Sequence, residues 1–121
     1  MDGYTSEEIG EARAPIASLL SKSEKAQQKL TPGTWQHTML GGNIRALQIA
    51  LPLVGEGDGT SQEATPDDLD SALRALDSMI ERVAATETKS EPGTSQHSLQ
   101  RNRLKALRIA RAAVMAKRGD R

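Results

Sequence analysis

One segment of this chain occurs twice, and the repetition limits what the chain can fold into. The letters TPGTWQHT at 31–38 return as EPGTSQHS at 91–98, which is 60 residues further on. In the same register, IRALQIA at 44–50 returns as LKALRIA at 104–110. An internal repeat of this kind indicates that one small structural unit is present in two copies. The two copies also show which positions of the unit are shared and which vary.

The apolar residues of the chain favour closely packed helices. Among 121 residues there is no Phe, one Trp and one Tyr, so the core must be built from Leu, Ile, Val, Met and Ala. The length fits one domain. The formal net charge is zero, so no overall field steers the protein toward nucleic acid or a membrane.

Two further features of the composition bear on location and chemistry. The chain has no Cys, which excludes disulfides, thiolate catalysis and thiolate metal sites. The first residues lack the basic and apolar stretches of a signal peptide. The longest apolar run, at 49–54, contains Pro52 and is too short to cross a bilayer. We therefore expect a cytoplasmic protein that needs neither a membrane nor a cofactor.

Each copy is predicted to form two helices joined by a tight turn. Thr5 and Thr65 each precede an acidic residue by three positions and predict helix N-caps. Pro15 predicts a kink or a late start in the first helix. Apolar and small residues then recur at steps of three and four, a stripe typical of bundle helices. The stripe consists of Ile9, Ala12, Ile16, Leu19, Ser23, Ala26 and Leu30 in copy one, and of Leu69, Ala72, Leu76, Met79, Val83, Thr86 and Ser90 in copy two.

The second helices are predicted at about 34–54 and 94–117. Gly41 and Gly42 predict a weakened or bent turn in the first of them, and Pro52 predicts a disturbed end.

These elements predict an all-α fold in a single domain, residues 1–121. Repeat one covers about 5–54, a flexible linker rich in Gly and acids covers 55–64, and repeat two covers about 65–117. The architecture that we expect is an up-down-up-down four-helix bundle built from two tandem helical hairpins. Both Pro-Gly-Thr turns should then lie at the end opposite the linker.

The repeated turn has a complete structural interpretation. Pro presets the turn, Gly supplies a positive φ, and Thr34 or Thr94 caps the helix that follows. The Gln and His residues that come next could serve as additional polar caps.

A functional interpretation of the same turn starts from Gln36, His37, Gln96 and His97. The two His are the only ones in the chain and occupy the same position in both copies. A bundle would bring both helix N-termini, with their free N–H groups, to one end, where Thr34 and Thr94 also lie. That end would suit a phosphate or carboxylate. The helical register places the Gln residues toward the core and the His residues at its edge.

Metal binding and catalysis have weaker support. Two His provide half of a zinc coordination shell, and no carboxylate at fixed spacing completes it, so no metal site is assigned. General acid–base catalysis by His requires an orienting partner and a pocket, and no nucleophile stands out, so no catalytic residue is assigned. Trp35, replaced by Ser95 in copy two, either covers the end of the core or anchors an interface.

Charge is distributed unevenly along the chain. Residues 56–91 carry ten acids and three bases, and residues 92–121 carry eight bases and one acid. Arg101, Lys105 and Arg108 share one exposed helical stripe that could contact phosphates of nucleic acid. Alternatively, an acidic third helix and a basic fourth helix are neighbours whose charges complement each other. No aromatic residues lie among the bases to stack on single strands.

Three functional hypotheses follow from these observations. The first is a non-catalytic interaction or regulatory module that binds a protein partner or self-associates. The second is a bundle that binds an anion, or less readily a metal, at the Gln and His end. The third is a weak nucleic-acid binder that uses the basic fourth helix.

Overall fold

The computed structural model describes residues 3–54 and 64–119, and in this part of the chain four α-helices pack together with no strand. They are α1 (Ser6–Gln28), α2 (Trp35–Ala50), α3 (Pro66–Lys89) and α4 (Ser95–Arg118), with a short 3₁₀ turn, η1 (Leu51–Leu53), after α2. The prediction of an all-α fold is confirmed. The predicted linker, 55–64, lies outside the described residues except for Ala64.

The first helix of each pair begins at the predicted cap. The Thr5 Oγ1 accepts from the Glu8 N–H at 3.0 Å, and the Glu8 Oε1 accepts from the Thr5 N–H at 3.0 Å. Thr65 and Asp68 make the same reciprocal pair at 3.1 Å. These capping boxes satisfy N–H groups that have no partner within the helix.

α1 and α2 are each continuous through their internal Pro or Gly residues. α1 runs through Pro15 without interruption, so the prediction of a late start is wrong. Ala12 and Ile16 are buried on either side of Pro15, and their packing in the core offsets the local cost of proline. α2 likewise continues through Gly41, where an added Cβ would lie 3.1 Å from the Gln27 Nε2. Pro52 does end α2, as predicted, and lies in η1.

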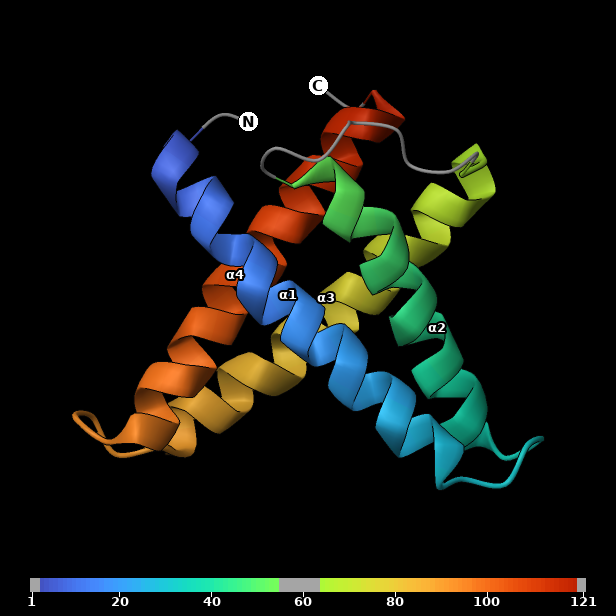
Figure 1. The fold of residues 1–121 in the computed structure, drawn as a ribbon, viewed down its shortest axis with the longest axis horizontal. Helices are drawn as coiled ribbons and strands as arrows, with labels where there is room; N and C mark the ends of the chain where they lie inside the picture. Colours follow the sequence, from blue (N-terminus) through green and yellow to red (C-terminus); the bar gives the residue numbers. More distant parts are fainter. Residues whose placement is uncertain (1–2, 55–63, 120–121) are drawn as a thin grey trace.

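The two hairpins, α1–α2 and α3–α4, cross each other in the shape of an X (Figure 1). α1 packs on α2 and α4, while α3 packs on α2 and α4. Helices α2 and α4 also touch across the centre, whereas α1 and α3 do not pack on each other within the described residues. The inter-helix turns lie on the side opposite the end of η1 and the start of α3, but at two separate corners of the molecule (Figure 1).

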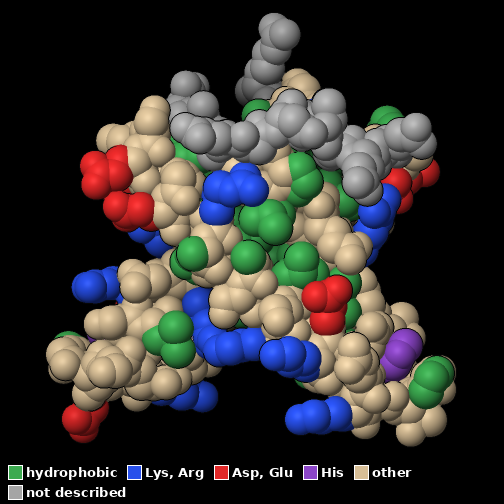
Figure 2. Space-filling view, viewed as in Figure 1, with side chains coloured by type: hydrophobic (Ala, Val, Ile, Leu, Met, Phe, Trp, Pro, Cys, Tyr) green, Lys and Arg blue, Asp and Glu red, His purple; other side chains and the backbone are tan. Residues whose placement is uncertain are grey.

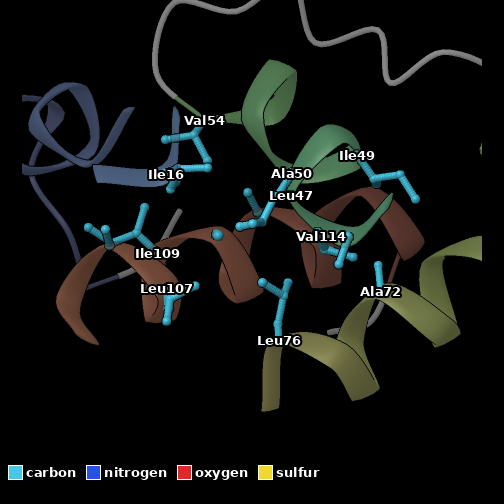
Figure 3. Close-up of a cluster of buried hydrophobic side chains, with 14 of the residues drawn as sticks. Ile16, Leu47, Ile49, Ala50, Val54, Ala72, Leu76, Leu107, Ile109 and Val114 are labelled. Atoms are coloured by element: carbon cyan, nitrogen blue, oxygen red, sulfur yellow. The ribbon is translucent and has the colours of Figure 1, made fainter. Parts of the chain in front are cut away.

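A single core lies where the hairpins cross, and all four helices contribute to it (Figure 3). Positions 60 residues apart are buried alike. The pairs Ile16 and Leu76, Leu47 and Leu107, and Val54 and Val114 each have 0% exposure. Small residues are buried on the second helices of both hairpins, namely Ala46, Ala50, Ala106, Ala110 and Ala113.

The predicted stripe of the first helices is buried over only part of its length. Ala12 and Ile16 belong to the core, and Leu19 packs against it. Beyond that point Ser23 and Leu30 are half-buried and Ala26 is exposed, and Thr86 is exposed in copy two. The predicted stripe therefore lies in the core only over its first part, because the hairpins diverge toward their turns (Figure 1).

Candidate functional site

The repeated turns have the same backbone geometry. Gly33 and Gly93 hold φ values of 95° and 87°, which are accessible to glycine without the steric cost that a side chain brings. Each following Thr accepts from the N–H of the His three residues later. The distance is 3.3 Å for Thr34 and 3.1 Å for Thr94. The predicted turn and cap chemistry is confirmed in both copies.

The Gln and His side chains point in the reverse of the predicted directions. Gln36 and Gln96 are exposed, whereas His37 is half-buried and the His97 side chain is 16% exposed. The reason is that the first turn of each second helix faces the last turn of the first helix in its own hairpin. It does not face the shared core, whereas the predicted directions assumed that the whole of the second helix faces that core.

Each His faces a polar residue ten positions earlier, a pairing that the sequence analysis missed. The Gln27 Nε2 donates to the His37 carbonyl oxygen at 3.1 Å. In copy two, the Glu87 Oε1 lies 3.9 Å from the His97 Nε2, and the His97 Nδ1 is buried without a hydrogen-bond partner. Gln27 and Glu87 are 60 residues apart, so comparison of the copies at this position could have found the pairing.

The structure does not bring the two turns together. The turn before α2 and the turn before α4 lie at different corners (Figure 1), so the expected shared end with four Gln and His side chains does not form. Each turn keeps its own helix N-terminus. Within residues 3–54 and 64–119, no three His, Asp or Glu side chains gather as metal ligands.

Trp35 does not cover the core. Its side chain is 68% exposed at the first position of α2, and Leu99, in the second turn of α4, is 42% exposed. These two are the exposed large apolar residues of the described chain. Met39, which corresponds to Leu99, is half-buried, and its Sδ lies 3.4 Å from the Arg82 Nη1. Figure 2 shows the two turn ends as separate lobes, each with apolar side chains on its surface.

The basic stripe of α4 is partly occupied by ion pairs. The Lys105 Nζ lies 2.5 Å from the Glu8 Oε2 on α1. This contact lowers the pKa of Glu8 and raises that of Lys105. Arg101 and Arg108 are exposed, and no ion pair of theirs is seen among the described residues. Figure 2 shows Lys and Arg side chains along the notch between the two lobes.

Complementary charges do join α3 to α4. The Arg111 Nε lies 2.5 Å from the Asp77 Oδ1, and the Arg118 Nε lies 2.8 Å from the Asp70 Oδ1. These contacts agree with the interpretation in which the acidic and basic helices are neighbours.

A second ion pair between the hairpins corresponds to the one between Glu8 and Lys105. The Arg45 Nη2 lies 3.6 Å from the Asp68 Oδ2. Asp68 lies 60 positions after Glu8, and Arg45 lies 60 positions before Lys105. The pKa of Asp68 is lowered, chiefly by the hydrogen bond from the Thr65 N–H and also by Arg45.

Three surface hollows lie beside the core. One of about 160 Å³ between α1 and α4 is lined in part by Glu8, Glu11, Asn102 and Lys105. Two others, of about 330 and 360 Å³, lie beside Arg45 and Arg74. None of these three is lined by the Gln and His residues of the turns.

Comparisons with protein-family models, with curated proteins and with solved structures give no match for this chain. None of the helices in the described part has both the length and the apolar character needed to cross a membrane.

Proposed function

We propose that this protein is a non-catalytic interaction module that binds a protein partner through the diverging ends of its hairpins. The observation that carries the proposal is Trp35, a large aromatic side chain that is 68% exposed at one of these ends. Indole side chains contribute strongly to protein interfaces when a partner covers them. Leu99 adds a second exposed apolar side chain at the other end.

The unburied part of the stripe supports the same proposal. Apolar residues continue beyond the core toward the turn of the first hairpin, where Leu30 and Met39 are half-buried. A partner that covers these surfaces would complete the burial that the core leaves unfinished.

We also infer that the chain arose by duplication of one hairpin into an up-down-up-down arrangement of helices. The 60-residue offset relates the sequences, the buried positions and the Glu8–Lys105 and Asp68–Arg45 ion pairs. Duplication would explain why each copy carries the same turn. Positions at which the two turns differ, such as Trp35 against Ser95, are then candidates for a function that only one of the turns carries.

Site-specific photo-cross-linking in the native cells tests the interaction proposal. A photoreactive aromatic amino acid, which keeps an aromatic ring at this position, replaces Trp35 in the full chain, and the control carries it at Ser71, which is exposed on α3 away from the turns. Position 35 should capture a defined polypeptide, either another protein or a second copy, and position 71 should not. Equal capture at both positions, or capture at neither, would contradict the proposal.

A further inference from the structure

We propose that the partner is a second copy of this chain, and that the first hairpin end of one molecule docks on the second hairpin end of the next. We name these ends tip 1, residues 25–39, and tip 2, residues 85–99. The inference rests on the proposed interaction function and identifies its partner.

The exposed apolar residues of the two tips are at different positions. Trp35 projects from tip 1 where tip 2 has the small residue Ser95. Leu99 is exposed on tip 2, where the corresponding Met39 of tip 1 is half-buried beside Arg82. Tip 1 therefore has a large exposed ring, and tip 2 has a small residue at that position and an exposed leucine one turn further along α4. This difference suits a contact in which the Trp35 ring of one molecule packs on Leu99 of the next.

The charges of the tips are also complementary. Tip 1 carries Lys25 and Lys29 and no acid, whereas tip 2 carries Glu87 and Glu91 with one base, Lys89. Both lysines of tip 1 are exposed, and no ion pair of theirs is seen among the described residues. Two copies of tip 1 would therefore repel each other, while tip 1 and tip 2 attract. This difference favours contact between unlike tips.

The positions of the tips determine what such a contact would build. They lie at separate corners (Figure 1), so one molecule can engage two neighbours at the same time. A contact between unlike surfaces is heterologous and extends into open chains or closes into a ring, in contrast to a twofold dimer. Each tip is one turn with parts of two helices. The contact therefore belongs to the small, weak class, below about 1,200 Å², and assembly should require a high protein concentration.

Sedimentation velocity of the full chain across a wide concentration range tests the proposal. The wild type should form a series of oligomers that shrinks as salt is added, because the paired charges are at the surface. Trp35→Ser, which installs the residue of tip 2, and Leu99→Ser should each be monomeric. Both changed side chains are exposed, so unfolding followed by circular dichroism should match the wild type. Gln36→Ala, at an exposed neighbour of Trp35, is the control and should assemble normally.

A mixture of the two variants gives the decisive measurement. Trp35→Ser keeps tip 2 and Leu99→Ser keeps tip 1, so a 1:1 mixture should form one heterodimer, with about a twofold rise in mass, and stop there. If Trp35→Ser fails to assemble while Leu99→Ser still assembles, the contact is between like tips and the inference is overturned. A wild type that stays monomeric would also overturn it. In that case, capture of a different polypeptide at position 35 would leave the proposed function standing, and capture of none would remove both.

Discussion

At the scale of single residues, Gly33 holds a positive φ of 95° and Gly93 one of 87°, and Gly10 lies within α1 with open space around it. Gly33→Ala or Gly93→Ala should lower the free energy of unfolding by about 1–2 kcal/mol, the cost of a left-handed backbone with a Cβ. Gly10→Ala should raise it by up to about 1 kcal/mol, because alanine favours a helix. Urea unfolding measures all three. Shifts in the same direction at positions 10 and 33 would contradict the assigned turn.

The carboxylates of Glu8 and Asp68, each of which takes part in a capping box and in an ion pair between the hairpins, predict a dependence of stability on pH. The pKa values of Glu8 and Asp68 are lowered from their ordinary values of 4.5 and 3.8. The native state therefore favours the ionised carboxylates. Their contribution is complete above the ordinary values and is lost as the pH falls through the lowered ones.

The Glu8→Gln/Asp68→Asn variant should therefore show a shallower fall in unfolding free energy on acidification below pH 4.5 than the wild type does. Chemical unfolding at a series of pH values measures this slope. Glu7→Gln, an exposed neighbour without an ion pair among the described residues, is the control. A double variant with the wild-type slope would show that these two carboxylates do not couple protonation to folding.

The sequence was sufficient to predict what depends on neighbours along the chain. The bonds of Thr34 and Thr94 join residues three apart, so the letters Pro-Gly-Thr determine them locally. The direction of His97 depends on Glu87 across the hairpin, and periodicity along one helix carries no information about that contact.

At the scale of helices and turns, Arg13 links α1 to the end of the second helix. The Arg13 Nη1 donates to the Leu51 carbonyl oxygen at 3.1 Å and also to that of Val54. Carbonyl groups at a helix end lack partners within the helix. In copy two, Leu73 stands in the place of Arg13, and α4 continues through Arg111, the counterpart of Leu51.

Arg13→Met should therefore lower the free energy of unfolding by about 1.5–3 kcal/mol, the value of a hydrogen bond from a charged group. Arg13→Lys, which keeps the charge and one donor, should recover part of the loss. Thermal and urea unfolding measure both variants. A methionine variant as stable as the wild type would show that solvent replaces the guanidinium at these carbonyls.

At the scale of the whole molecule, the number of helices and their approximate positions could be predicted, but the crossing of the hairpins could not. The crossing depends on how α2 packs on α3 and how α1 packs on α4 between the two hairpins. A pattern of apolar residues gives the face that packs but leaves the angle between two faces open, because several crossing angles fit similar ridges and grooves. The expected shared site of the two turns failed for this reason.

The relation between the hairpins gives the final prediction, which concerns residues 64–121 alone. In the full chain α4 packs on α1, and in a homodimer of this fragment it would pack on the α3 of the partner. Leu76 would take the place of Ile16, and Asp68 that of Glu8, so that Lys105 keeps a carboxylate partner. The fragment should therefore form a helical homodimer whose helix content rises with concentration.

Circular dichroism and sedimentation of the fragment measure this association. Lys105→Asp should weaken the dimer by placing like charges together, and adding Asp68→Lys to the same chain should restore it. A fragment that stays unfolded at every concentration would show that the first hairpin provides packing that its counterpart cannot replace. In that case the two halves are not interchangeable, and differences such as Arg13 against Leu73 are part of the fold.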